Sequence, residues 1–224
     1  MREMFIGHYA VGFAAKRLAP RTSLGALMAA AILLDLLWPI FLLIHWEQVA
    51  IEPNANPFLR LDFVAYPISH GLIAVVGWAT LFAALYFGAA RYVLGASLIW
   101  VGVVSHWLLD FLVHRRDLPL YAHSRLFGLG LWNHRWLTMA IEFTMFTIAI
   151  WTYQRQTQAR DRIGQYAFWS FLILLLLAYV AVAFGPPPTS VKSVAIAALF
   201  SWLFVPWAWW FDHHRAPRVA RLNQ

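Results

Sequence analysis

The chain has 224 residues, of which 62% are hydrophobic and only 12% are charged, whereas a soluble domain has about 25% charged residues. With a mean hydropathy of +0.62 and no cysteine, it is expected to be an all-α, polytopic membrane protein without disulfides, thiolate metal sites or a cysteine nucleophile. The net charge of +7 is spread over short loops and the C-terminus, which favours a role in membrane topology and argues against nucleic-acid binding.

Residues 1–224 are expected to form one integral membrane domain: a transmembrane helical bundle of about six spans plus a short N-terminal helix. The N-terminal stretch Phe5–Leu18 is too short to cross a bilayer alone, so we expect it to lie at the interface or to be partly inserted. The spans are predicted at about 24–45, 66–88, 92–113, 136–153, 166–184 and 193–211. The distribution of lysine and arginine places the Lys16–Arg21 cluster, and with it both termini, in the cytoplasm.

Polar side chains interrupt the first apolar segments. His8 follows Gly7 in the short N-terminal helix, where Tyr9 is the only other polar residue before Lys16. Asp35 lies near the middle of the first predicted span, four residues before Pro39. Because proline has no N–H, we expect a kink at the carbonyl of Asp35, and such a break inside a membrane must be buried in protein or line a wet cavity.

The next two spans add imidazoles and a second carboxylate. His70 lies at the start of the second span, after Ser69, and taken alone it could be an interfacial residue. In the third span His106, Asp110 and His114 follow one another at four-residue intervals, which places them on one helical face. An aspartate at mid-membrane costs about 2.5–3.5 kcal/mol on insertion scales. Either a hydrogen-bonded His–Asp pair that tightens helix packing or a bound cation would explain this cost.

Five of these polar residues are predicted to be metal ligands: His8, Asp35, His70, His106 and Asp110. They come from four helices, and ligands that converge from facing helices are how helical bundles form metal sites. Nitrogen and oxygen ligands without sulfur indicate a divalent transition metal, with zinc expected and manganese or iron as alternatives. They would hold one metal with an open position, or two metals bridged by an aspartate, and either would lower the pKa of a bound water.

Further candidates surround this set. Glu142 in the fourth span and His114 are the predicted acid–base residues, although Glu142 could equally be a partner for an arginine. Arg115, Arg116 or Arg135 is expected to bind an anionic headgroup.

The order of these motifs resembles the YdjM-like family of membrane-bound metal-dependent hydrolases. The matching pieces are Gly7-His8, Asp35, Ser69-His70 and the SHxxxD pattern of Ser105, His106 and Asp110, within residues 5–142. That family is thought to be distantly related to the zinc phospholipase C group, whose sites use a similar HxxxD helix. The resemblance implies a hydrolase in a bacterial inner membrane.

Three functions remain open from the sequence. The first is hydrolysis of a phosphoester or lipid-like substrate in the bilayer through a metal-activated water. The second is a proton- or ion-coupled small-molecule transporter, because intramembrane Asp and His also form proton relays. The third is a non-catalytic membrane assembly protein whose polar residues only hold helices together.

Overall fold

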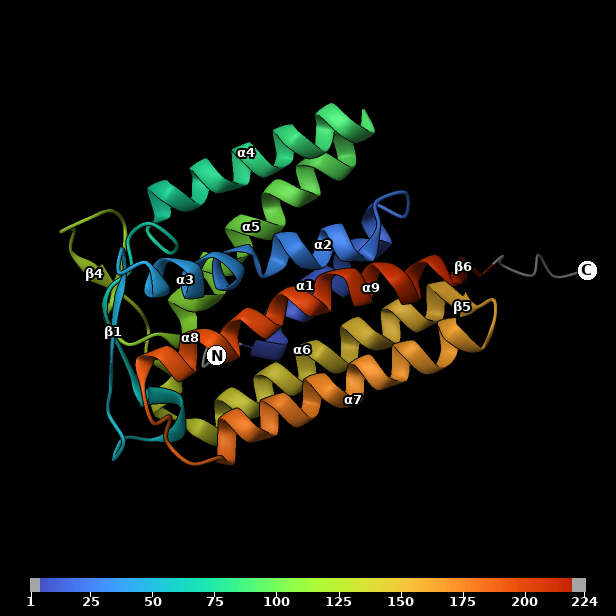
Figure 1. The fold of residues 1–224 in the computed structure, drawn as a ribbon. Helices are drawn as coiled ribbons and strands as arrows, with labels where there is room; N and C mark the ends of the chain where they lie inside the picture. The colour runs from blue at the N-terminus through green and yellow to red at the C-terminus, as the bar shows by residue number, and fades with distance from the viewer. Residues whose placement is uncertain (1–4, 219–224) are drawn as a thin grey trace, which may run out of the picture.

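The computed structural model describes residues 5–218, which form an elongated bundle of helices along one axis (Figure 1). The helices are α1 (Phe5–Leu18), α2 (Leu24–Ala31), α3 (Leu33–Leu43), α4 (Leu72–Ala90), α5 (Val93–Val113), α6 (Arg135–Gln156), α7 (Arg162–Phe184), α8 (Val191–Leu199) and α9 (Phe204–His213). Single 3-10 turns lie at Pro57–Leu59, Leu131–Asn133 and Phe200–Leu203.

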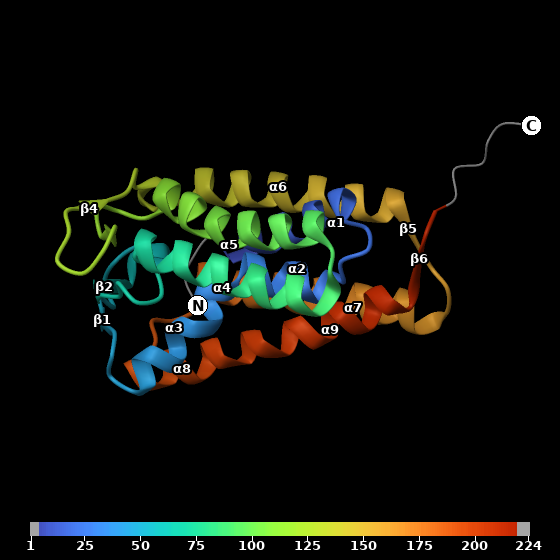
Figure 2. The same cartoon turned by 90° about the horizontal axis from the view of Figure 1, so that it is seen from above.

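Short antiparallel strand pairs cap the two ends of the bundle (Figure 2). At one end, β1 (Gln48–Ile51) pairs with β2 (Leu61–Ala65), and β3 (Leu118–Pro119) pairs with β4 (Leu126–Phe127). At the other end, β5 (Thr157–Ala159) pairs with β6 (Arg215–Pro217), beside the last described residues. We call these the loop end and the β5–β6 end.

Four helical segments are long and apolar enough to cross a membrane, and the α2–α3 pair is a fifth if its two bent halves form one span. The four are α4, α5, α7 and the run Val191–His213 formed by α8 and α9. The expectation of six spans is therefore not confirmed. The remaining predicted span, 136–153, forms α6, which is long enough but carries Glu142 inside it and Arg155 in its last turn. The second span begins at Leu72 and not at 66, because residues 66–71 form a turn.

Lipid-facing surface is most extensive on α4, which packs mainly against α5. Only 11% of its apolar window is buried within the protein, against 39% for α5 and α7. Ile73 and Leu85 on α4 and Leu177 on α7 are each more than half exposed. A helix that is apolar on every side belongs in a hydrophobic environment, so these faces are those expected to contact lipid.

Helix α1 lies inside the bundle, packed against α6, α2 and α5. Its residues Phe5–Ala10, together with Gly12 and Phe13, are buried. The segment is therefore packed within the bundle, and its depth relative to the membrane stays a prediction. Gly12 permits the close approach, because a Cβ there would lie 2.6 Å from the sulfur of Met28 on α2.

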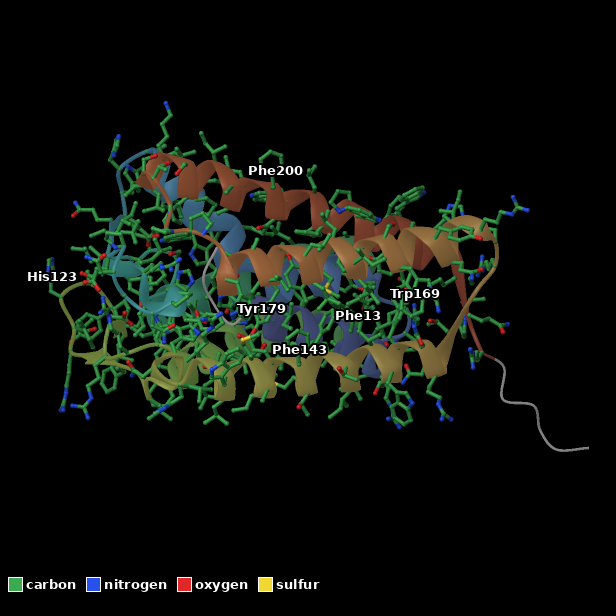
Figure 3. All side chains as sticks on the ribbon, turned by 90° about the horizontal axis from the view of Figure 1, so that it is seen from below. Phe13, His123, Phe143, Trp169, Tyr179 and Phe200 are labelled. Carbon is green, nitrogen blue, oxygen red and sulfur yellow. The ribbon has the colours of Figure 1, made fainter. Side chains whose placement is uncertain are left out.

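An aromatic cluster holds α1 against the last helices. The ring of Phe13 lies within 6.5 Å of rings on α6, α7 and α9, among them Tyr153, Phe168 and Phe211. Figure 3 shows Phe13 between α6 and α7, with Phe143 and Tyr179 nearby. Edge-to-face and offset aromatic pairs of this kind add to the stability that their apolar burial provides.

A break between α2 and α3 falls at Ile32, where the two helices meet at 57°. The kink expected at Asp35 is thus displaced by three residues toward the N-terminus. Pro39 lies inside α3, which continues to Leu43. Proline removes a single intrahelical hydrogen bond, and α3 absorbs that loss without a break of its own.

Close packing of α2 on α9 predicts that Gly25→Ala destabilises the protein. A Cβ at Gly25 would lie 2.6 Å from the Cβ of Trp209 and 2.8 Å from the carbonyl oxygen of Val205. Overpacking of this kind costs about 1–3 kcal/mol. We expect a lower midpoint of thermal unfolding in detergent, followed by tryptophan fluorescence. Gly77→Ala is the matched control, because nothing lies within 4 Å of its added Cβ; equal midpoints for the two variants would contradict the packing argument.

Candidate metal centre

The structure brings the five predicted ligands together at one buried place. His8 comes from α1, Asp35 from α3, His70 from the turn before α4, and His106 and Asp110 from α5. The exposed fraction of each residue is 5% or less. Two overlapping groups could each hold a cation: Asp35 with His70 and His106, and His8 with His106 and Asp110.

Four ligand atoms are spaced as if around a shared cation. The Nε2 atom of His106 lies 3.3 Å from both Asp35 Oδ1 and Asp110 Oδ2. The Nε2 atom of His70 lies 3.7 Å from the same two oxygens. Neighbouring ligands of a tetrahedral zinc are about 3.3–3.6 Å apart for bonds of about 2.0–2.2 Å, whereas N–H···O hydrogen bonds measure about 2.7–3.2 Å. Within residues 5–218 these two carboxylate oxygens are buried and accept no hydrogen bond.

His70 is oriented by a serine and a carboxylate from neighbouring loops. Ser69 Oγ donates to Glu47 Oε2 at 2.6 Å and lies 2.7 Å from His70 Nδ1. Because a hydroxyl has one hydrogen, Ser69 must accept from the Nδ1–H of His70, and the Nε2 atom of His70 faces the centre. Burial raises the pKa of Glu47, outweighing the hydrogen bonds from Ser69 that lower it. Such partners behind a histidine are typical of metal sites.

The helix break at Ile32 gives His106 its own partner. His106 Nδ1 lies 2.8 Å from the carbonyl oxygen of Ala31, the last residue of α2. Carbonyls at a helix end need donors from outside the helix. A carbonyl only accepts, so Nδ1 of His106 carries a hydrogen, and its Nε2 atom faces the two carboxylates.

His8 contacts the opposite oxygen of Asp110. Its Nε2 lies 3.1 Å from Asp110 Oδ1, which is hydrogen-bond length, and its ring stacks on that of His106 with centroids 3.6 Å apart. In this geometry His8 donates to Asp110 and directs Oδ2 of that carboxylate toward the other three residues. These residues, His8, His106 and Asp110, also form the second group that could hold a cation.

Glu142 anchors the helix that carries His8. Its Oε2 accepts hydrogen bonds from the backbone N–H groups of Ile6 at 3.1 Å and Gly7 at 3.3 Å. These donors belong to the first turn of α1, where intrahelical acceptors are missing and a negative charge is favourable. The contact explains how a short helix holds His8 at this depth. Glu142 was predicted to be an acid–base residue. In the structure its contacts hold the first turn of α1 against α6.

His114 lies in a second cluster and not among the ligands. The α-helix ends at Val113, and His114 has extended backbone geometry, so the expected common face with His106 and Asp110 ends before it. Its Nδ1 lies 2.9 Å from Asp117 Oδ1 and 3.3 Å from the hydroxyl of Tyr66. The ring of Tyr66 is 5.2 Å from His70 and 6.0 Å from His114.

The three arginines expected to bind a headgroup have different surroundings. Arg115 forms ion pairs with Asp62, Asp117 and Glu52. Burial lowers the pKa of Arg115, but these carboxylates outweigh it and raise the pKa above its ordinary value. Arg115 is therefore already neutralised. Arg135 stacks over the ring of Phe184, and Arg116 is exposed.

Sequence reasoning missed the residues behind the ligands. Ser69 stands next to His70 in the same pattern as Ser105 next to His106, yet Ser105 Oγ bonds to the carbonyl of Gly102 instead. A serine that precedes the histidine is therefore its hydrogen-bond partner in the Ser69-His70 motif and not in the Ser105-His106 motif. Glu47 lies 22 residues before Ser69, and no spacing in the sequence connects them.

Comparison with models of known protein families, with curated proteins and with solved structures gave no match for this chain.

Removal of either α5 ligand is expected to abolish metal binding. His106→Ala and Asp110→Ala each remove one candidate ligand. The transition-metal content of the purified protein, measured by elemental analysis, should therefore fall from near-stoichiometric to background. His123→Ala, in an exposed loop at the loop end (Figure 3), is the matched control and should keep its metal. Wild-type protein that neither retains nor takes up zinc, manganese or iron would overturn the assignment.

Ser69→Ala is expected to weaken metal binding without abolishing it. The variant frees the Nδ1 of His70 and disconnects Glu47, and loss of such a partner typically lowers affinity by about 10–100-fold. Competition with a fluorescent zinc chelator measures the change. Ser105→Ala should bind like wild type, since Ser105 bonds only to the Gly102 carbonyl; equal losses in both variants would contradict a specific role for Ser69.

Proposed function

We propose that the protein is a membrane-embedded, metal-dependent hydrolase acting on a phosphoester or lipid-like substrate. The observation that carries the proposal is the set of four atoms from Asp35, His70, His106 and Asp110, in which each nitrogen lies 3.3–3.7 Å from both oxygens. We further propose an inner-membrane location with both termini cytoplasmic, on the basis of the lysine and arginine distribution.

The charges at the centre favour a divalent cation. When both imidazoles are neutral, their hydrogens are on Nδ1 toward Ser69 and Ala31. The Nε2 atoms then face two carboxylates, so two nitrogens and two oxygens converge on the common space. Buried charges are tolerated when they are paired or coordinate a metal. A divalent cation balances the two aspartates and is attracted by all four atoms.

Zinc fits the donor set best. Two imidazole nitrogens and two carboxylate oxygens are ligands that zinc accepts in tetrahedral or expanded geometry. Manganese and iron accept the same donors, and the absence of cysteine argues against sites selective for copper(I). His8 is assigned to hold Asp110 and Glu142 to hold α1, so neither needs to bind the metal directly.

Hydrolysis is the reaction class that the motif order favours through its resemblance to the YdjM-like family. Such a metal, when bound, supplies a nucleophilic hydroxide near neutral pH and polarises the bond to be broken. Asp35 has the most accessible side chain of the ligands, with 7% exposed against 1% or less for the others. Access for a substrate is therefore assigned to the α3 side of the centre. A lipid-like substrate suits a site surrounded by apolar helices.

The experiment is a hydrolysis assay in mixed micelles, with a chromogenic phosphodiester and a glycerophospholipid as separate substrates. Purified protein treated with chelator should lose activity and regain it with zinc or manganese. Asp35→Asn keeps the shape of the side chain but removes a charged ligand, and activity should fall by at least 100-fold. Bound metal with no turnover of either substrate would contradict hydrolysis and favour the transporter.

Glu142→Gln distinguishes an anchor from an acid–base residue. The amide keeps one oxygen to accept from Ile6 and Gly7 but cannot release a proton, so for an anchor we expect a lower rate with an unchanged shape of the pH–rate profile. An essential acid or base contributes one limb of that profile. Disappearance of a limb in the variant would assign Glu142 to proton transfer instead.

A further inference from the structure

A basic cavity of about 830 Å³ lies at the β5–β6 end. It is lined by the last turns of α1 and α6, the end of α9 and the β5–β6 pair, which lie together in both ribbon views (Figures 1 and 2). It is separate from the metal centre, since Glu142 and Arg155 are roughly 20 Å apart along α6 at about 1.5 Å per residue. We call this cavity the basic pocket.

Among the described residues that line the basic pocket, Asp212 alone has a carboxylate, and this group already has partners. Asp212 Oδ2 lies 2.7 Å from Lys16 Nζ and accepts from the backbone N–H of Leu24 at 3.0 Å. Its other oxygen accepts from the hydroxyl of Tyr153 at 2.8 Å. The Asp212 carboxylate therefore neutralises Lys16 and joins helices, and it is not available to the other cations.

Five arginines line the basic pocket without a carboxylate partner anywhere in residues 5–218. They are Arg17, Arg21, Arg155, Arg160 and Arg218, all of them exposed. Among them, the guanidinium of Arg21 lies over the ring of Tyr92 and that of Arg155 over the ring of Trp151. Like charges gathered in a concave site attract anions, and the planar guanidinium binds phosphate through two parallel hydrogen bonds.

Tryptophans place the basic pocket at the level of the headgroups. Trp151 lines the cavity and is 57% exposed, and Trp210 on α9 is 44% exposed. Exposed tryptophans concentrate at the membrane–water boundary. Phosphate groups of lipids lie at that depth, and basic pockets between membrane helices bind anionic headgroups.

We propose that the basic pocket binds a polyanionic phosphate ligand, independently of the metal centre. The ligand is either the headgroup of an anionic phospholipid or a soluble phosphate compound, because the arginines recognise the same group in both. The cavity volume lies within the range of about 300–1,000 Å³ found for small-molecule sites.

The test uses the full-length protein in a neutral detergent. Native mass spectrometry measures retention of cardiolipin, which has two phosphates, against phosphatidylcholine, which is zwitterionic. Calorimetry with sodium pyrophosphate measures binding of a free phosphate compound. Arg17→Gln/Arg155→Gln should weaken binding of the preferred ligand at least tenfold. Arg125→Gln/Lys192→Gln removes the same charge from exposed positions outside the pocket and should change it less than twofold.

Each outcome either overturns the proposal or identifies whether the ligand is a lipid headgroup or a soluble phosphate compound. Selective retention of cardiolipin supports a lipid headgroup, and binding of pyrophosphate without cardiolipin supports a soluble ligand. Equal weakening in both double variants shows general charge attraction and overturns the pocket, as does binding of neither probe. Arg160→Gln/Arg218→Gln, on the β5–β6 side, repeats the test should the first variant unfold. Metal content should stay unchanged in all variants, so failure here is distinct from failure of the metal centre.

Discussion

Two buried carboxylates that face two imidazole nitrogens set the main constraint on this structure. Asp35 and Asp110 lie among apolar helices, each within 3.3–3.7 Å of His70 Nε2 and His106 Nε2. Unpaired charge at such depth is unfavourable by several kcal/mol. Because the outer nitrogens of both histidines have acceptors of their own, their Nε2 atoms face the two carboxylates, an arrangement that could hold a cation.

Several irregular features of the bundle are explained by this constraint. The break at Ile32 turns the Ala31 carbonyl toward His106, so an interruption of the helix becomes part of the site. The turn before α4 places Ser69 between His70 and Glu47. Without such partners, the helix break and the buried polar side chains would each destabilise the bundle, because helix ends and buried polar groups need hydrogen-bond partners.

Helix α1 depends on the same arrangement. It is too short to cross a bilayer, yet Glu142 binds its first backbone N–H groups and Phe13 packs among the rings of α6, α7 and α9. Its two ends lie at different places: His8 contacts Asp110 in the candidate metal centre, and Arg17 lines the basic pocket at the opposite end. Helix α1 thus contributes one residue to each of the two candidate sites, which lie at different places along the bundle.

Hydropathy and residue spacing were enough to predict the helical membrane class, the extent of Phe5–Leu18 and the five residues that meet at the centre. Apolar length and the expense of a buried His or Asp are local properties, so they can be read without coordinates. Four other features came from the folded chain: the helix breaks at Ile32, His114 leaves the ligand face, Glu142 holds α1, and Glu47 lies behind His70. These features depend on hydrogen bonds between segments up to 136 residues apart, and no periodicity within a single helix encodes which distant partner a buried polar group will find.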